Sequence, residues 1–515
     1  MDGLMMDTPL SLIHLFDRGT RLFADKEIVA STPGGMERLS YGDWGDRTRR
    51  LGGMLDDLDI SGDGRVATFA WNNSRHLELY FAAPCTGRVS HTLNLRLFPE
   101  QLTYIVNHAE DEVIFVDHSV AGLIWPLMDA FDTVRHVVLM DDGAPAPDAD
   151  AIRADVHDYE SLLASASAVE WTRVDENRAS SMMYTSGTTG RPKGVLHSHD
   201  SLHALITQLG RYWRIEPGDT FLVPSPVAHI GGSIYAFECP LLLGTQAVLM
   251  QRWDPDRAVA LMLEHGCTHM AGATPFLDGL LAAAQRADTR LPDLKVFICG
   301  GASVPPSLIR RATQDLDKAA VSRVYGSTEV PVTTVGSLDD AERAADTDGR
   351  PGVAEAVIVD GEIRSRGPQM FRGYLHPEDS AGAFDESGYF RTGDLGRFTD
   401  DGHLVVTGRA KDIIIRNGEN ISPKEVEDIL VTHPQIAEIA IVGVPDSRTG
   451  ERACATIVAA GGGGPEVADL HEFLVAHGVA KFKVPEQVRF VDALPKNDAG
   501  KVLKHVLKAD LIKES

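Results

Sequence analysis

The chain has 515 residues, of which 43% are hydrophobic and 24% are charged, with 74 acidic against 49 basic side chains. The length predicts two to four domains, and the composition excludes a wholly disordered protein. Because nucleic acids are polyanions, the net charge of −25 excludes a nucleic-acid partner, and it disfavours an anionic membrane surface for the same reason.

Features outside any motif predict a cytoplasmic protein without a membrane span. The five cysteines are odd in number, scattered and never in a CxxC pair, which is typical of a reducing compartment. The N-terminal residues include Asp2 and Asp7 but no basic segment, so no signal peptide is expected. The most apolar stretch, residues 234–250, is interrupted by a glutamate, a proline and a glycine, so no membrane span is expected.

Short apolar runs alternate with segments of helical periodicity over the first 400 residues. Ser40 is a candidate N-cap of a helix whose buried face carries Trp44, Leu51, Met54, Leu55 and Leu58. Strands are expected at residues 113–116, 136–140, 295–299 and 321–325, with a helical segment at 120–131. The last two strands each run into glycine, the pattern of parallel α/β sheets that bind ligands at the carboxyl ends of their strands. The predicted fold class is therefore α/β.

The pattern changes near residue 400. The capping-box sequence Ser422-Pro423-Lys424-Glu425 predicts a helix that runs to about Thr432. The other expected elements are strands at 403–407, 413–415, 436–444, 453–459 and 487–491 and a helix at 466–477. These elements predict a compact α+β unit of about 100 residues. We expect two domains, residues 1–408 and 409–515, with the boundary at Gly408–Lys411.

Charge is distributed unevenly between these two parts. Residues 409–515 carry 14 basic and 16 acidic side chains, a net charge of −2, so −23 of the total belongs to residues 1–408. Nine of the 13 lysines lie beyond residue 410. A nearly neutral, lysine-bearing small domain therefore follows a strongly acidic large one.

The most specific motif is YTSGTTGRPKG at residues 184–194, directly after two apolar methionines. Its glycines let the backbone turn several N–H groups toward an anion, its hydroxyls add donors, and Lys193 adds a positive charge. These groups suit the phosphates of a nucleoside triphosphate. The motif is not a Walker A loop, because Gly194 rather than serine or threonine follows Lys193.

Weaker motifs follow in order along the chain. They are Gly-Gly-Ala at 300–302, YGSTE at 325–329, YFRTGDLG at 389–396, GRAKD at 408–412 and PKNDAGK at 495–501. Together with residues 184–194, they resemble the adenylate-forming superfamily of acyl-CoA synthetases, peptide-synthetase adenylation domains and firefly-type luciferases. The segments WNNSRHLELYFAA and HTLNLRLFPEQLTYIVNHAED look most like the medium- and long-chain acyl-CoA ligase branch.

The resemblance implies both an architecture and a site. It implies a large N-terminal domain of sheet-and-helix subdomains with a small distorted barrel, followed by a mobile C-terminal lid. It implies that the residues that bind ATP are Thr185, Ser186, Gly187, Thr188, Thr189, Gly190, Lys193, Gly301, Ala302, Tyr325, Gly326, Thr328, Asp394, Arg409 and Lys501. Within this set, Asp394 would hold the ribose hydroxyls with help from Arg409. Glu329 would hold Mg²⁺, and Lys411 occupies the hinge position.

The chemistry of the superfamily explains these residue types. A carboxylate is a poor acyl donor, because attack by a thiol would have to expel oxide. The carboxylate instead attacks the α-phosphorus of ATP, releases pyrophosphate and leaves acyl-AMP, which the thiol of CoA then attacks. The residues expected to take part directly are Thr185, Lys193, His229, Glu329 and Lys501. Because Lys501 and the thiol cannot both occupy the centre, the lid is expected to rotate between the half-reactions.

The expected acyl pocket follows the HxxG pattern of Pro226–Gly232 but lacks the aromatic residue that many fatty-acyl ligases place before His229. No aspartate stands beside His229 to bind an amino group, so an amino-acid substrate is disfavoured. The expected substrate is a medium-chain aliphatic or alicyclic acid. The predicted lining residues are His229, Ile230, Gly232, Tyr235, Thr274, Gly300 and Val330, although Tyr235 and Val330 fit core packing equally well.

The sequence thus predicts an ATP-dependent acyl-CoA synthetase with ATP, Mg²⁺, CoA and a carboxylic acid as its small-molecule partners. The main alternative is a stand-alone acyl-AMP ligase that loads the pantetheine of a carrier protein. A luciferase-like oxygenase and a non-catalytic sensor that kept the fold are further alternatives. Aryl acids also stay open as substrates, and a homodimer stays open as the oligomeric state.

Overall fold

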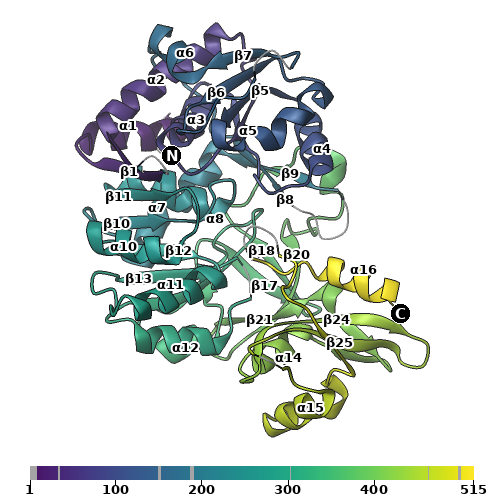
Figure 1. The fold of residues 1–515 in the computed structure, drawn as a ribbon. Helices are drawn as coiled ribbons and strands as arrows, with labels where there is room; N and C mark the ends of the chain where they lie inside the picture. The colour runs from purple at the N-terminus through teal and green to yellow at the C-terminus, as the bar shows by residue number, and fades with distance from the viewer. Residues whose placement is uncertain are drawn as a thin grey trace, which may run out of the picture.

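A computed structural model of the chain is drawn in Figure 1, and it describes residues 8–32, 35–148, 152–185, 191–301, 303–461, 463–496 and 500–514. Two large mixed sheets with helices packed on them form most of the molecule, and a smaller C-terminal unit follows. The predicted α/β fold class is confirmed. Within the described ranges, no helix is both long enough and apolar enough to cross a membrane.

The first large sheet has eight strands, parallel from β8 to β7, with antiparallel β9 and β19 added at one edge. Its strands in spatial order are β19 (Gly373–Tyr374), β9 (Lys193–Ser198), β8 (Ala179–Thr185), β4 (Val89–Thr92), β3 (Arg65–Phe69), β5 (Asp111–Asp117), β6 (His136–Met140) and β7 (Asp155–Asp158). The strands that flank residues 186–192 therefore lie near one edge of this sheet.

The second large sheet has nine strands, parallel from β14 to β1. Its strands in spatial order are β16 (Arg350–Pro351), β15 (Thr334–Val335), β14 (Ala320–Tyr325), β13 (Val296–Gly300), β12 (His269–Gly272), β10 (Thr220–Val223), β11 (Gln246–Met250), β1 (Glu27–Thr32) and β2 (Gly35–Ser40). The glycine-ended strands predicted at 295–299 and 321–325 are β13 and β14, which are direct neighbours.

Helices follow most of the parallel strands. Those of the first 350 residues are α1 (Leu12–Leu22), α2 (Tyr41–Asp57), α3 (Ser74–Cys85), α4 (Pro99–Ala109), α5 (His118–Ile124), α6 (Tyr159–Ser165), α7 (His199–Trp213), α8 (Ile230–Ser233), α9 (Cys239–Leu243), α10 (Pro255–His265), α11 (Thr274–Arg286), α12 (Pro306–Asp315) and α13 (Ala341–Asp346). A π-helix, η3 (Ile234–Glu238), connects α8 to α9.

An antiparallel sheet of four strands stands where the resemblance implies the small barrel, and it consists of β17 (Glu355–Val359), β18 (Glu362–Arg366), β20 (Phe390–Phe398) and β21 (Leu404–Arg409). The C-terminal unit lies beside it at the lower right of Figure 1. Its elements are β22 (Ile414–Arg416), β23 (Glu419–Ile421), α14 (Pro423–Leu430), β24 (Ile436–Asp446), β25 (Gly450–Ala459), α15 (Val467–Ala476), β26 (Gln487–Phe490) and α16 (Lys504–Glu514). A short 3₁₀ helix, η5 (Ala410–Asp412), leads from β21 to this unit.

Two predicted local features differ from the structure. Residues 120–131 do not form one helix, because α5 ends at Ile124 and a 3₁₀ helix, η1 (Trp125–Ala130), follows. The helix predicted at Ser422 does begin there, but the capping box is wrong: the Ser422 hydroxyl donates to the Thr407 carbonyl at 2.5 Å. At Ser40 the prediction is confirmed, since its Oγ accepts the Asp43 N–H at 3.0 Å as the N-cap of α2.

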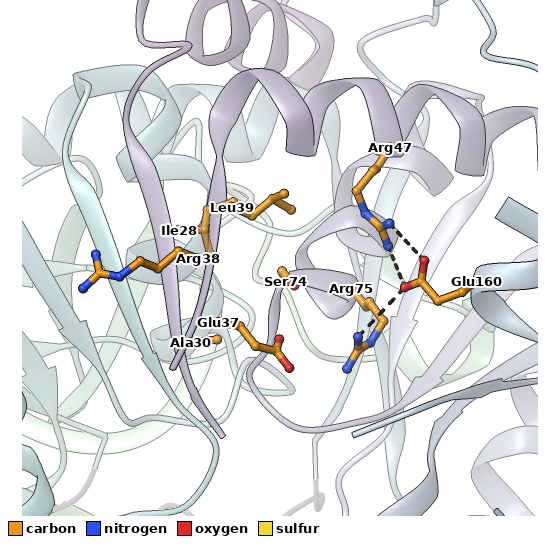
Figure 2. Close-up of a pocket in the computed structure, with 9 residues that line it drawn as sticks. All are labelled: Ile28, Ala30, Glu37, Arg38, Leu39, Arg47, Ser74, Arg75 and Glu160. Carbon is orange, nitrogen blue, oxygen red and sulfur yellow. Dashed lines mark hydrogen bonds and ion pairs between the residues drawn. The ribbon is translucent and has the colours of Figure 1, made fainter. Parts of the chain in front are cut away.

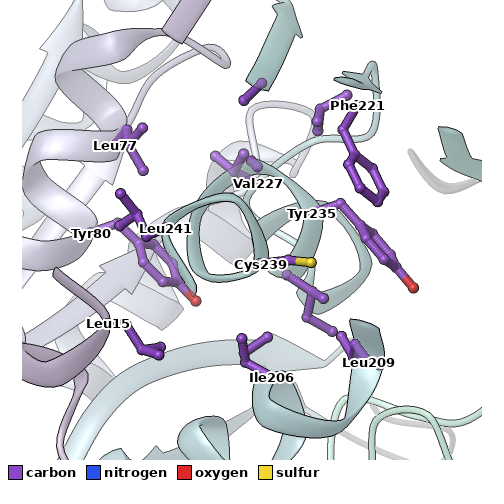
Figure 3. Packing of buried hydrophobic residues seen from close by; sticks show 14 of the residues in the cluster. Leu15, Leu77, Tyr80, Ile206, Leu209, Phe221, Val227, Tyr235, Cys239 and Leu241 are labelled. Atoms are coloured by element: carbon purple, nitrogen blue, oxygen red, sulfur yellow. The ribbon is translucent and has the colours of Figure 1, made fainter. Parts of the chain in front are cut away.

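A hydrophobic core joins the two large sheets. It includes Met183 from β8 of the first sheet and Phe221 from β10 of the second, together with apolar side chains of α1, α3 and α7. Figure 3 shows part of this core around the helical segment that carries Tyr235 and Cys239. Burial of these side chains removes apolar surface from water on both sheets, so the sheets are expected to be held rigidly against each other.

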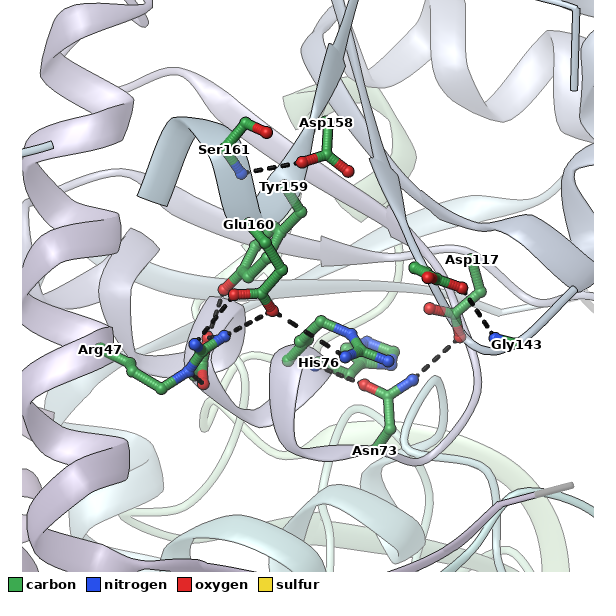
Figure 4. Close-up of polar contacts among 12 residues, drawn as sticks. Arg47, Asn73, His76, Asp117, Gly143, Asp158, Tyr159, Glu160 and Ser161 are labelled. Atoms are coloured by element: carbon green, nitrogen blue, oxygen red, sulfur yellow. Dashed lines mark hydrogen bonds and ion pairs between the residues drawn. The ribbon is translucent and has the colours of Figure 1, made fainter. Parts of the chain in front are cut away.

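A polar network joins α2, α3 and α6 beside this core. Arg47 Nε lies 2.6 Å from Oε1 of Glu78, whose side chain is fully buried, and Arg47 Nη2 lies 2.9 Å from Glu160. The Tyr159 hydroxyl donates to the other oxygen of Glu78. Figure 4 shows the Arg47 side chain reaching from its helix, α2, to Glu160, and Figure 2 shows that Arg47, Arg75 and Glu160 line one pocket.

A buried aspartate, Asp117, lies at the end of β5 and is expected to make the stability of the fold depend on pH. Asp117 is fully buried, and its Oδ2 accepts the Trp71 N–H at 2.8 Å and the Asn73 amide at 2.9 Å. Burial raises the pKa of this carboxyl to about 7. A raised pKa in the folded state stabilises the fold fully below the ordinary aspartate pKa of 3.8, and this contribution is lost as the pH rises through about 7.

We therefore expect Asp117→Asn to weaken the dependence of stability on pH. Between pH 5 and pH 8, the free energy of unfolding should fall less in this variant than in the wild type, because asparagine has no charge to bury. Urea unfolding at four pH values measures this difference. Equal slopes in the two proteins would contradict the role given to Asp117.

Candidate active site

The phosphate-loop motif runs from the end of β8 to the start of β9. Thr185 and Lys193 are paired across these two strands, so the two ends of the motif lie side by side. The Lys193 ammonium donates to the Asp379 carbonyl at 2.8 Å and lies 4.8 Å from the centre of the Tyr374 ring. The predicted contacts of Ser186, Gly187, Thr188, Thr189 and Gly190 lie outside the described residues.

Thr328 and Glu329 follow the carboxyl end of β14. Gly326 allows this turn, since a Cβ there would lie 2.7 Å from the backbone nitrogen of Val332. The Thr328 carbonyl accepts a hydrogen bond from Nε2 of His197 at 2.7 Å, and the Tyr374 hydroxyl donates to Oε1 of Glu329 at 2.9 Å. Both contacts fix the Thr328–Glu329 segment against the first large sheet.

Glu329 fits a magnesium site. Its side chain is almost completely buried, and the Tyr374 hydroxyl orients its carboxylate. Nucleotide sites commonly hold Mg²⁺ through one or two carboxylates together with the phosphates of the substrate. The donor type of Glu329, and the Tyr374 side chain that it shares with Lys193, are therefore suitable for a metal–nucleotide complex.

Asp394 is held from two sides. Its Oδ2 accepts the Tyr325 hydroxyl at 2.9 Å, and its Oδ1 lies 2.9 Å from Nε of Arg409, the residue paired with it across β20 and β21. Burial and the Asp394 charge raise the pKa of Tyr325, so its hydroxyl stays protonated and donates. The arrangement leaves a rigid carboxylate that can accept hydrogen bonds from a ribose.

The loop that carries Lys501 belongs to the C-terminal unit but contacts the N-terminal part of the chain. The preceding Gly500 has φ +75°, and a Cβ there would lie 2.7 Å from the ring of Pro275 at the start of α11. Burial and the nearby Arg409 lower the pKa of Lys501 to about 8. The Lys501 loop of the C-terminal unit therefore contacts the start of α11, with the charges of Arg409 and Asp394 near enough to affect the pKa of Lys501.

The residues predicted to bind adenine follow β13, and the predicted hinge residue lies on η5. Gly301 has φ +81°, a conformation that favours glycine, directly after β13, whereas Ala302 lies outside the described residues. Lys411 lies on η5, between β21 and β22. Burial and the charge of Arg409 lower its pKa, while Asp412 and Asp394 oppose this shift.

Part of the predicted acyl pocket surrounds the start of α8. The Asn94 amide lies 3.5 Å from Nε2 of His229, and burial together with the charge of Arg96 lowers the pKa of that imidazole. Gly232 packs so tightly that a Cβ would lie 2.2 Å from the Pro226 carbonyl oxygen. Ile230 adjoins these residues at the first position of α8. His229, Ile230 and Gly232 are therefore together.

The other predicted lining residues are more scattered. Thr274 donates to the Ser303 carbonyl at 2.8 Å at the start of α11, and Gly300 packs against Val324. Tyr235 stacks on Phe221 at 5.5 Å inside the core drawn in Figure 3. Val330 is likewise buried, in a separate cluster of apolar side chains. The positions of Tyr235 and Val330 fit the core-packing interpretation.

Two side chains that contact these motifs were not predicted as site residues. They are His197 and Tyr374, and both lie outside the motifs considered. Tyr374 lies 45 positions from Glu329 in the sequence, so local spacing does not relate them. The only sequence signal is an aromatic residue directly after Gly373, ahead of a proline turn at Pro377.

Comparisons with known proteins agree with this arrangement. A family model described as AMP-binding enzyme matches residues 16–375, and one described as AMP-binding enzyme C-terminal domain matches residues 425–501. The chain is 36% identical to 3-methylmercaptopropionyl-CoA ligase of Ruegeria lacuscaerulensis, over 99% of this chain and 98% of that protein. It is 34% identical to the medium-chain fatty-acid–CoA ligase of Escherichia coli, over 84% and 79% respectively.

Among solved structures, MatB from Rhodopseudomonas palustris is similar in two states. Its ATP-bound crystal structure has a TM-score of 0.86, with 28% identity over 97% of this chain and 99% of that chain. Its apo structure has a TM-score of 0.75 at the same identity and coverage. The chain therefore superposes more closely on the ATP-bound form.

The chain belongs to the AMP-binding enzyme family. Within the adenylate-forming superfamily, it is a member of the acyl-CoA synthetase branch. The predictions of an AMP-forming acid–thiol ligase and of ATP and CoA as its co-substrates are confirmed at the level of this class.

Proposed function

We propose that this enzyme activates a medium-chain aliphatic or alicyclic carboxylic acid as acyl-AMP and then transfers the acyl group to CoA. The observation that carries this proposal is the contact of the Lys501 loop with the start of α11, at Gly500 and Pro275, within electrostatic range of the Asp394–Arg409 pair. The two CoA ligases named above act on short or medium aliphatic acids according to their names, which supports the substrate class.

In the proposed first half-reaction, Asp394 holds the ribose of ATP, and the β8–β9 turn with Lys193 binds its phosphates. The ammonium of Lys501 lies between the carboxylate and the α-phosphate, where it reduces repulsion between these anions and stabilises charge as the new P–O bond forms. The α-phosphorus–pyrophosphate bond breaks, and pyrophosphate leaves. Mg²⁺, when bound at Glu329, supplies charge neutralisation of the phosphates. His229 would face the acyl group from the start of α8.

In the proposed second half-reaction, the thiol of CoA takes the place of Lys501 after the C-terminal unit has rotated. The thiol loses its proton, its sulfur forms a bond to the acyl carbon of acyl-AMP, and the bond from that carbon to the phosphate oxygen breaks, so that AMP leaves. We propose Lys411 as the hinge, since η5 is the connection between β21 and the C-terminal sheet. The position of Lys501 and the higher TM-score to ATP-bound MatB both support the first half-reaction as the state of this structure.

Three further proposals concern the domains, the location in the cell and the oligomeric state. We propose residues 1–408 as the catalytic domain and 409–515 as the lid, with the β21–β22 connection as the moving part. A cytoplasmic location fits an enzyme that needs ATP and CoA and whose five cysteines are buried thiols rather than disulfides. A homodimer stays a prediction that size measurement in solution would test.

The substrate class is tested by pyrophosphate release with a panel of acids. We expect the highest kcat/KM for unbranched acids of about six to ten carbons or cyclohexane carboxylic acids, because each additional buried methylene contributes about 0.8 kcal/mol until the pocket is filled. Benzoate-type acids serve as the comparison set. A preference for aryl acids over every aliphatic acid would contradict the proposed class.

The identity of the acyl acceptor distinguishes the proposed acyl-CoA synthetase from the alternative, an acyl-AMP ligase that loads a carrier protein. The panel's best acid is supplied with ATP and either free CoA or a carrier protein bearing pantetheine, and thioester formation is measured. Transfer to CoA is expected. Transfer only to the carrier protein would establish the acyl-AMP ligase instead, and the absence of pyrophosphate release with all acids would support a non-catalytic sensor.

A further inference from the structure

The segment from Phe371 to Ser380 connects the two elements to which ATP phosphates and Mg²⁺ are assigned above. Its strand β19 pairs with β9 directly after Lys193, and the Leu375 N–H donates to the Gly194 carbonyl at 2.8 Å. At its start, the Phe371 N–H donates to the Glu329 carbonyl at 2.8 Å. One short segment is therefore hydrogen-bonded to both elements.

Tyr374 is the side chain of this segment that contacts both charged groups. Its hydroxyl donates to Glu329 Oε1 at 2.9 Å, and its ring centre lies 4.8 Å from the Lys193 ammonium. The ammonium is held in this place by its second contact, the Asp379 carbonyl of the same segment at 2.8 Å. The ring also packs edge-on against Phe371, with centroids 5.0 Å apart, so its orientation is fixed.

We propose that Tyr374 is a positioning residue for acyl-AMP formation, whose hydroxyl orients the carboxylate of Glu329 toward the metal and whose ring holds the ammonium of Lys193 toward the phosphates. The proposal rests on the roles proposed above for Glu329 and Lys193. It adds that one side chain, Tyr374, fixes the Glu329 carboxylate and the Lys193 ammonium relative to each other, rather than each charge being positioned separately by its own segment.

The chemistry of the two contacts explains why tyrosine serves both. A hydrogen bond to one oxygen of a metal-binding carboxylate restricts its rotation, so that the other oxygen is directed toward the cation. The face of an aromatic ring attracts an ammonium without neutralising it, so Lys193 keeps its full charge for the phosphates. A carboxylate in place of the ring would neutralise Lys193 instead.

Tyr374→Phe tests the hydroxyl alone. ATP binding is measured by calorimetry at graded Mg²⁺ concentrations and in EDTA. We expect the Mg²⁺ concentration that gives half of the metal-dependent gain in ATP affinity to rise about 10-fold, as is usual when a partner of a metal ligand is lost. The affinity for ATP in EDTA should be unchanged. Excess Mg²⁺ should restore kcat for acyl-AMP formation.

Tyr374→Leu tests the ring as well. It should show the same change in Mg²⁺ dependence and, in addition, bind ATP in EDTA about 2- to 5-fold more weakly, because Lys193 is no longer held over a ring. An affinity in EDTA equal to that of the wild type would overturn the part of the proposal that concerns Lys193.

The matched control is Tyr389→Phe. The Tyr389 hydroxyl also donates to a carboxylate, that of Glu355 at 2.8 Å, and its ring centre also lies 4.4 Å from a cation, the Arg366 guanidinium. Its partners are therefore Glu355 and Arg366 rather than Glu329 and Lys193. This variant should leave the Mg²⁺ dependence unchanged. A change equal to that of Tyr374→Phe would show a general effect of losing a tyrosine hydroxyl and would overturn the proposal.

Glu329→Gln separates failure of this inference from failure of the proposed function. If Tyr374 acts through Glu329, Tyr374→Phe should have no further effect on Mg²⁺ dependence in the Glu329→Gln background. An unchanged Mg²⁺ dependence in Glu329→Gln alone would overturn the metal assignment, and the role of Tyr374 with it. A changed dependence in Glu329→Gln with none in Tyr374→Phe would overturn only the positioning role.

Discussion

Lys501→Ala is expected to slow acyl-AMP formation by at least about 10²–10³-fold, while transfer of the acyl group from supplied acyl-AMP to CoA stays within a few-fold of the wild type. The reason is that the Lys501 loop packs against Pro275 in this arrangement of the two parts, within electrostatic range of Asp394 and Arg409, where the nucleotide is expected. The transfer step needs the lid rotated, so Lys501 would then lie elsewhere. The two half-reactions are measured separately, by pyrophosphate release and by thioester formation.

Lys508→Ala is the control for this experiment. Lys508 lies on α16 of the same C-terminal unit, and its ammonium is paired with Glu451 of that unit at 2.9 Å. Its replacement should leave both half-reactions within a few-fold of the wild type. Equal losses of both half-reactions in Lys501→Ala would contradict a role confined to adenylation.

The lowered pKa of Lys501 adds a dependence on pH. Because burial and Arg409 lower this pKa to about 8 in the free enzyme, the ammonium form is lost as the pH rises through 8. The kcat/KM for ATP reports ionisations of the free enzyme, so its alkaline limb should have a midpoint near 8. Lys501→Arg should move this limb to higher pH, since arginine stays charged. If another group causes the alkaline limb, the pH profiles of the wild type and of Lys501→Arg will coincide, which would contradict the titration assigned to Lys501.

Most of the correct predictions came from local patterns in the sequence, such as apolar runs and short motifs. Residues 136–140 form β6 as expected, because a short apolar run bounded by polar residues fits a buried strand. The order of the motifs placed the chain in its family, and Asp394 and Arg409 lie side by side because β20 and β21 are adjacent in sequence as well as in space.

Contacts between distant segments could not be predicted in this way. Tyr374 meets Glu329 because β19 pairs with β9, a strand about 180 positions earlier in the chain. Ser422 donates to the Thr407 carbonyl instead of capping its own helix, since the fold brings that acceptor within 2.5 Å. In both cases tertiary structure supplies a partner that the local sequence does not contain.

Arg47→Ala is expected to lower the free energy of unfolding by about 3 kcal/mol. Arg47 Nε lies 2.6 Å from Oε1 of Glu78, a fully buried carboxylate, so its loss leaves a charge inside the protein that keeps the hydrogen bond from the Tyr159 hydroxyl but has lost its cation. Removal of one member of a buried ion pair costs more than the pair contributes, because the remaining charge has lost its water. Urea unfolding measures the change.

Arg38→Ala is the matched control, because Arg38 forms an ion pair of similar length, 2.8 Å to Glu27, between exposed side chains. Its loss should cost no more than about 1 kcal/mol. A cost for Arg47→Ala as small as that for Arg38→Ala would contradict the idea that burial makes the Glu78 contact important. Arg47→Leu combined with Glu78→Leu should recover most of the stability, since no charge is then left buried.

The dependence on pH gives this prediction a second test. Burial raises the pKa of Glu78, whereas the charge of Arg47 lowers it, so loss of Arg47 moves this pKa further above its ordinary value of 4.5. A raised pKa means that the stability of the variant is retained fully below 4.5 and falls as the pH rises through the folded-state pKa. The deficit of Arg47→Ala should therefore shrink on acidification from pH 7 toward pH 5, while that of Arg38→Ala stays small throughout.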